Sequence, residues 1–137
     1  MTDELNRPPP EKGIKDARKV TELLSHENIT KVKSSPYKRA IQTVVGTSNY
    51  FGLSILIDEG FRERKLADSS VTNFDEVILK YWENFNFSLN GGEAGFVAQY
   101  RGVQSLKGVL IAAHMSNILR KTIIALLLTS GCIKKHC

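Results

Sequence analysis

The sequence predicts a three-layer α/β fold with a mostly parallel sheet, and three observations support that class. Two short segments, 29–33 and 53–57, have the alternating or mainly apolar pattern of strands. Apolar residues at helical spacing precede, separate and follow these two segments. Because successive parallel strands need a crossover connection, strands separated by helices indicate a parallel sheet with helices on its faces.

The first half of the chain divides into two helices and two strands. Between residues 11 and 25 apolar side chains recur at helical spacing, which predicts an amphipathic helix lying on the sheet. The strand at 29–33 follows. A second helix is expected over 36–51, because its opening proline suits the first helical position and Gly52 is a suitable terminator. The buried strand at 53–57 then completes this half.

A charged loop over 58–70 leads into the second half, which is mainly helical in pattern. A wide apolar stripe over 74–85 predicts a third helix that contributes to the core. After a pair of glycines, helical spacing resumes over 93–107 and again over 117–128. The apolar run at 123–128 predicts a buried helix face, since a bilayer span needs about 20 residues.

Composition limits the classes of protein that this chain can represent. With 137 residues, of which 42% are hydrophobic and 24% charged, it can build one domain with a core. We expect that domain over residues 1–128, with an irregular tail over 129–137. The formal charge of +5 suits anionic ligands, yet bases and acids are interspersed and no aromatic platform accompanies them. We therefore expect neither a nucleic-acid partner nor a membrane partner.

The cysteines give little indication of a redox or metal function. Cys132 and Cys137 both lie in the last few residues, and no apolar segment opens the chain, so we expect a reduced cytoplasmic setting. With His136 they offer three candidate metal ligands. Because structural metal sites usually need four ligands, we expect no metal and no other cofactor.

One run, Ser-Ser-Pro-Tyr-Lys-Arg-Ala-Ile-Gln-Thr over 34–43, places several anion-binding groups at a strand-to-helix junction. Ser34 and Ser35 are expected at the helix cap, beside free backbone N–H groups and the positive end of the helix dipole. Arg39 adds a planar fork that can bind two phosphate oxygens. Ordinary helix capping is the alternative interpretation of Ser-Pro taken alone.

The run over 34–43 closely resembles the second motif of the histidine phosphatase superfamily, which is also called phosphoglycerate mutase-like. This resemblance implies that Arg39 holds the substrate phosphoryl group. The segment Gly-Phe-Arg-Glu-Arg-Lys-Leu over 60–66 resembles the family's loop with a proton-donating carboxylate, which maps to Glu63. Gly91-Gly92-Glu93 resembles its Gly-Glu-Ser helix start, and 109–114 resembles the apolar strand that delivers a second active-site histidine, His114.

The resemblance implies hydrolysis of a phosphorylated small molecule through a phosphohistidine. Arg39 would bind phosphoryl oxygens, Glu63 would serve as general acid and then base, and His114 would stabilise the developing charge. Each has a structural alternative, since Arg39 and Glu63 could form a surface ion pair and His114 could be a core histidine. The stretch between Asp58 and Gly91 is short and lacks a long substrate-capping insertion, which favours a phosphatase over a mutase within the family.

The sequence departs from the family pattern where the nucleophile is expected. Family members begin with a central strand that ends in Arg-His-Gly, whereas this chain opens with a polar segment that resembles the loop after that strand. His26 lies before a strand and not after one, so it is a poor substitute, and Met115 stands where the family has glycine. We therefore expect an incomplete, truncated domain with impaired turnover and weak phosphate binding.

A missing central strand has two further implications. The strand at 29–33 and the one ending at His114 would each have an unpaired edge, which predicts self-association of the chain. The competing hypothesis is a non-catalytic remnant that serves as a phosphate-binding or interaction module.

Overall fold

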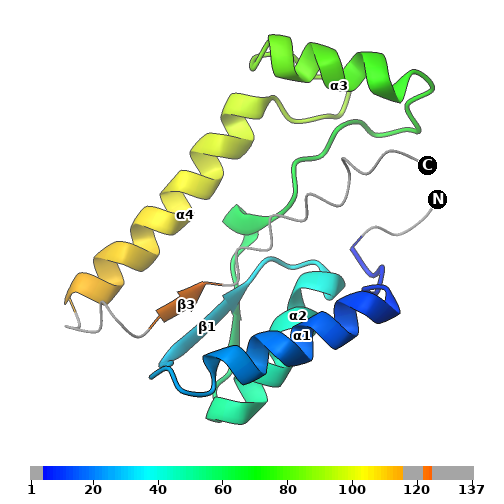
Figure 1. The fold of residues 1–137 in the computed structure, drawn as a ribbon. Helices are drawn as coiled ribbons and strands as arrows, with labels where there is room; N and C mark the ends of the chain where they lie inside the picture. Colours follow the sequence, from blue (N-terminus) through cyan, green and yellow to red (C-terminus); the bar gives the residue numbers. More distant parts are fainter. Residues whose placement is uncertain (1–4, 116–121, 125–137) are drawn as a thin grey trace.

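The computed structural model describes residues 5–115 and 122–124, which form helices around a small sheet (Figure 1). The elements are, in chain order, α1 (Glu11–Leu24), β1 (Lys31–Ser34), α2 (Lys38–Phe51), β2 (Ile55–Ile57), the 3-10 turn η1 (Glu59–Phe61), α3 (Phe74–Glu83), α4 (Gly95–Met115) and β3 (Thr122–Ile124). The expected tail at 129–137, including Cys132, His136 and Cys137, lies outside the described residues.

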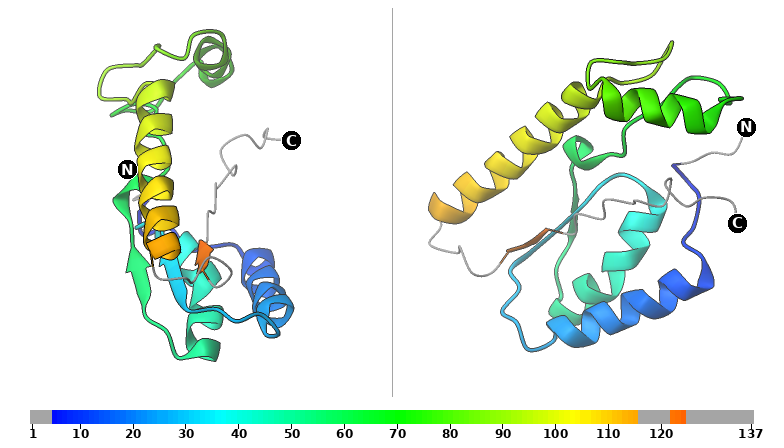
Figure 2. Two further views of the ribbon diagram at one scale, coloured as in Figure 1. Left: turned by 90° about the vertical axis from the view of Figure 1, so that its left-hand side faces the viewer. Right: turned by 45° about the horizontal axis from the view of Figure 1, so that its top comes forward.

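The sheet is parallel and has the order β2-β1-β3. Val32 at its centre is aligned with Ile55 on one side and Ile123 on the other. α1 and α2 lie side by side, and α2 contacts both β1 and β2 (Figure 2). The predicted α/β class with a parallel sheet is confirmed.

The core lies where α2 covers the sheet. Val32 is fully buried and packs with Ile29 and Val44. Gly52 ends α2 with a φ of 66°, a left-handed conformation that glycine adopts without the Cβ penalty of other residues. The predicted terminator of the second helix is therefore confirmed.

α4 corrects one expectation about the second half. The segment 109–113, which the family resemblance implies is a strand and which the residues alone leave open between a strand and a helix end, continues the helix that begins at Gly95, so that α4 runs unbroken to Met115. No turn-forming pair separates the two parts, and the leucine and alanines near its end are good helix formers. α4 meets the rest of the fold mainly at η1 and lies apart from α1 and α2 (Figures 1 and 2).

β3 (Thr122–Ile124) corrects two further expectations from the sequence. It lies inside 117–128, where the sequence predicted a helix with a buried face, and its Thr-Ile-Ile sequence is β-branched throughout. It also pairs with the edge of β1 that was expected to lack a partner. Both edges of β1 are therefore hydrogen-bonded in the structure.

Within the described residues, no helix combines the length and the apolar character that crossing a membrane requires.

Candidate functional site

Ser34 and Ser35 lie at the end of β1, but they do not cap α2. Ser34 is fully buried and its hydroxyl donates to the carbonyl oxygen of Ser35 at 2.9 Å. The N-cap of α2 is Tyr37, whose side chain makes no capping hydrogen bond. The serine hydroxyl is satisfied by the adjacent backbone within the turn, so the expected capping role is wrong.

The first turn of α2 is partly occupied by another segment of the chain. The N–H of Lys38 donates to the carbonyl oxygen of Leu5 at 2.9 Å, which leaves that donor unavailable to an external anion. One backbone donor at the start of α2 is therefore already used within the chain.

Arg39 and Glu63 are brought together, as their predicted roles require. Arg39 is in the first turn of α2 and its Nη2 donates to Oε2 of Glu63, in the loop after η1. Their side chains are 17% and 26% exposed, so both remain in partial contact with solvent. The Arg39 guanidinium also lies 4.9 Å from the ring centroid of Tyr37.

His114 and His26 lie elsewhere. His114 is exposed in the last turn of α4. It lies nine residues beyond Ser105, whose hydroxyl contacts Asp58 at the start of the loop after β2. At a rise of about 1.5 Å per residue, that is roughly 14 Å further along the helix. His26 is exposed just after α1, at the opposite end of β1 from Arg39. The structure does not bring either imidazole to the Arg39–Glu63 pair.

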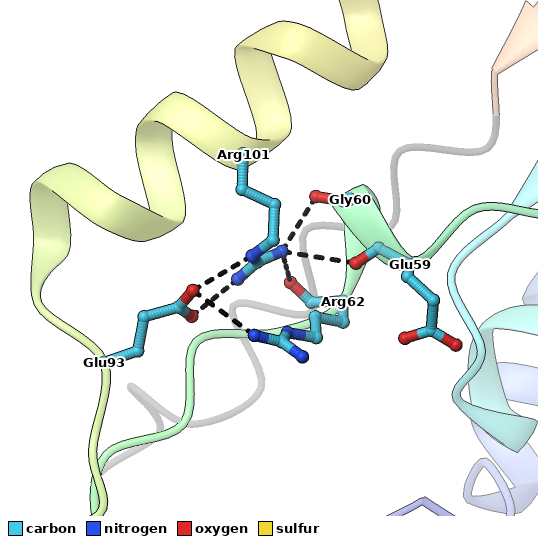
Figure 3. Close-up of polar contacts among 5 residues, drawn as sticks. All are labelled: Glu59, Gly60, Arg62, Glu93 and Arg101. Carbon is cyan, nitrogen blue, oxygen red and sulfur yellow. Dashed lines mark hydrogen bonds and ion pairs between the residues drawn. The ribbon is translucent and has the colours of Figure 1, made fainter.

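Arg101 forms the densest polar cluster of this region (Figure 3). Its Nε and Nη2 donate to the two carboxylate oxygens of Glu93, at 3.0 and 2.6 Å. Its Nη1 donates to the carbonyl oxygens of Gly60 at 2.8 Å and Arg62 at 2.9 Å, with that of Glu59 at 3.5 Å. One guanidinium therefore joins α4, the segment before it and the loop that leads to Glu63.

The charge on Glu93 is stabilised by this geometry. Hydrogen bonds from Arg101 lower the pKa of the Glu93 carboxyl, against the opposing effect of burial, and the charge of Arg62 lowers it further. The Glu93 side chain is 10% exposed, so solvent screens the interaction only weakly. The carboxylate form is thus the one that the fold holds.

Asp58 ties the start of the same loop to the sheet and to α4. Its carboxylate accepts from Lys33 Nζ at 3.0 Å, Ser105 Oγ at 2.8 Å and the N–H of Gly60 at 3.0 Å. Burial alone raises the pKa of Asp58, but these three donors outweigh it and the pKa is lowered.

Sequence reasoning missed Arg101, Asp58 and their partners. Helical side-chain pairs are three or four residues apart, so the eight-residue spacing between Glu93 and Arg101 does not indicate the pair, which forms because Glu93 lies in the segment before α4. No residue pattern marks the carbonyl oxygens that Arg101 binds. Among the described residues, no three histidine, cysteine, aspartate or glutamate side chains form a metal-binding group.

Comparison with known proteins agrees with the fold. The family described as histidine phosphatase superfamily (branch 1) matches residues 8–118. Among solved structures, the native mycobacterial glucosyl-3-phosphoglycerate phosphatase is similar with a TM-score of 0.73 and 21% identity, over 96% of this chain and 70% of that one. The structure of that phosphatase in complex with inorganic phosphate has a TM-score of 0.73 and 22% identity, over 96% of this chain and 72% of that one. A structure described as mycobacterial hydrolase 2 has a TM-score of 0.72 and 22% identity, over 96% of this chain and 64% of that one. No curated protein sequence matches the chain.

Proposed function

Since the chain belongs to the histidine phosphatase superfamily, we propose that Arg39 and Glu63 form its site for the phosphoryl group of a phosphorylated small molecule. The observation that carries the proposal is their contact beyond the carboxyl end of β1. Ligands of open α/β sheets bind at that end of the strands. A guanidinium is suited to two oxygens of a phosphate.

The two side chains have complementary roles in phosphomonoester hydrolysis. Arg39 binds non-bridging oxygens and neutralises the charge that develops as the bond between phosphorus and the leaving oxygen breaks. Glu63, in its acid form, donates a proton to that leaving oxygen. As a carboxylate it instead accepts from Arg39, so phosphate and the Glu63 carboxylate compete for one guanidinium.

We further propose that these 137 residues alone hydrolyse phosphomonoesters slowly or not at all. Their three histidines are His26, His114 and His136. The first two lie away from Arg39, as described above, and His136 is outside the described residues. A histidine that attacks phosphorus must lie in line with the bond that breaks. The proposed activity of this chain is therefore weak phosphate binding with little turnover.

A non-catalytic phosphate-binding module is the second candidate. The observation that favours it is that neither His26, just after α1, nor His114, in the last turn of α4, lies beside the Arg39–Glu63 pair. The two candidates share the binding site and differ in whether a phosphohistidine forms.

The test is a titration with inorganic phosphate followed by NMR of the labelled protein. We expect a dissociation constant on the order of millimolar, and at least tenfold weaker binding in Arg39→Ala. Lys38→Ala is the matched control, because it removes an equal charge from the neighbouring, exposed position of the same helix. Equal losses in both variants would refute the assignment to Arg39.

Turnover is measured separately with p-nitrophenyl phosphate and by trapping phosphohistidine. We expect neither signal above that of Arg39→Ala. A stable phosphohistidine on the purified chain would overturn the proposal of low turnover and leave the phosphate site in place.

We also propose that the chain self-associates, through the outer edge of β2 and not through β1. β2 is an outer strand of the described sheet, and its Leu56 and Ile57 side chains are 46% and 49% exposed. Apolar edge strands promote pairing between chains. Sedimentation over a concentration series should show dimers or larger species that Leu56→Lys reduces, and a monomer throughout would contradict this.

A further inference from the structure

We infer that Arg101 is a positioning residue for Glu63, an inference that rests on the function proposed for the Arg39–Glu63 pair. Arg101 lies on α4 and contributes no atom to that pair. Its guanidinium instead holds the backbone of the loop from which Glu63 projects (Figure 3).

Arg101 holds the peptide unit that joins Arg62 to Glu63. The carbonyl of Arg62 and the N–H of Glu63 belong to one planar group. Nη1 of Arg101 donates to that carbonyl oxygen at 2.9 Å and to the carbonyl oxygen of Gly60 at 2.8 Å. Fixing two carbonyls, one of them in the peptide that carries the Cα of Glu63, restricts both the position and the direction of its side chain.

The guanidinium can act as an anchor because it is itself held in place. Glu93 binds it through both carboxylate oxygens, a bidentate geometry that fixes the plane of the guanidinium. The Arg101 side chain is 17% exposed, and it projects from the 21-residue helix α4. The loop is thereby anchored to the long, regular helix α4.

A second contact between α4 and the loop lies one turn further along the helix. Ser105 donates to Asp58 at 2.8 Å, and a Cβ added to Gly60 would lie 1.6 Å from the Ser105 hydroxyl oxygen. The loop backbone therefore packs directly against α4. Arg39, by contrast, belongs to α2, so α4 sets the distance between the two members of the Arg39–Glu63 pair.

The test uses the NMR signal of the Arg39 Nε–H group, which reports the ion pair in the absence of phosphate. Glu63→Gln defines the position of this signal when the ion pair is lost. We expect Arg101→Gln to move the signal to that position. Arg101→Lys should do the same, because an ammonium cannot bind Glu93 bidentately and two carbonyls at once, yet it keeps the charge needed for folding.

Arg62→Gln is the matched control for the loss of an arginine beside Glu93. Its side chain is 47% exposed and reaches Glu93 at 3.5 Å. We expect the Arg39 signal of this variant to stay near that of the unmodified protein. An unmoved Arg39 signal in folded Arg101→Lys would refute the positioning role, as would an equal movement in Arg62→Gln.

Phosphate affinity separates this inference from the proposed function. Glu63→Gln removes the competitor for Arg39 and should tighten phosphate binding about fivefold. In the Arg101→Lys background the same change should have almost no effect, since Glu63 no longer reaches Arg39. Additive effects would refute the role of Arg101, whereas binding that does not depend on Arg39 would refute the phosphate site and leave the NMR result to decide on Arg101.

Discussion

Replacing Glu93 with glutamine should destabilise the fold by about 3 kcal/mol, because the carboxylate accepts two hydrogen bonds from Arg101 at 3.0 and 2.6 Å. Hydrogen bonds to charged groups contribute about 1.5–3 kcal/mol each. Glutamine keeps one acceptor oxygen, but its amide nitrogen then faces a guanidinium donor. The 10% exposure of the Glu93 side chain leaves little solvent to compensate.

Thermal unfolding followed by circular dichroism measures this change. For a chain of this size 1 kcal/mol corresponds to about 4 °C, so Tm should fall by about 12 °C. Glu59→Gln is the matched control. It makes the same chemical change in an exposed side chain of η1, whose carboxylate lies away from Arg101 in Figure 3. A surface change of this kind should alter stability by less than about 0.5 kcal/mol.

The stabilisation that Glu93 contributes should be lost as the pH falls. The pKa of Glu93 is lowered from its ordinary 4.5 in the folded state, so the unfolded chain binds the proton more readily. The stabilisation is complete above pH 4.5 and disappears as the pH falls through the lowered pKa. The Tm difference between the protein and Glu93→Gln should therefore be constant from neutral pH to about 5 and then shrink. A difference that persists in acid, or one matched by Glu59→Gln, would refute the reasoning.

Three further substitutions test the packing of the fold by the same measurement. Tyr81→Phe should cost about 1 kcal/mol, because it removes a 2.7 Å hydrogen bond from a buried hydroxyl to the carbonyl oxygen of Leu66. Gly52→Ala should cost about 1–2 kcal/mol through its positive φ alone, since the space around it is open. Gly60→Ala should cost about 1–3 kcal/mol through its clash with Ser105, and Ser105→Ala should recover only part of that loss.

The first half of the fold follows from local patterns in the sequence. Apolar spacing identified α1, α2 and α3, and Gly52 marked the end of α2 because a left-handed residue is needed there. The Arg39–Glu63 contact joins two motifs 24 residues apart and was expected only through the family resemblance. Spacing alone does not bring a helix residue to a particular loop.

The second half could not be predicted in the same way. The apolar residues 109–113 suit either a strand or a buried helix, and what decides is the absence of a turn before them. Conversely, the three residues of β3 lie in a segment with helical spacing, and only pairing with β1 makes them a strand. The clamp of Arg101 on loop carbonyls was not predictable, because every residue carries a carbonyl.

The pairing of β1 with both β2 and β3 joins segments at very different distances along the chain. The connection from Ser34 to Thr122 is roughly four times as long as that from Ser34 to Ile55, which adds about 1.2 kcal/mol of loop-closure entropy. The ribosome also delivers β3 after all the other described elements. We therefore expect β1 to pair with β2 before it pairs with β3. Until β3 arrives, the backbone groups of β1 that it binds are expected to be open to pairing with other strands.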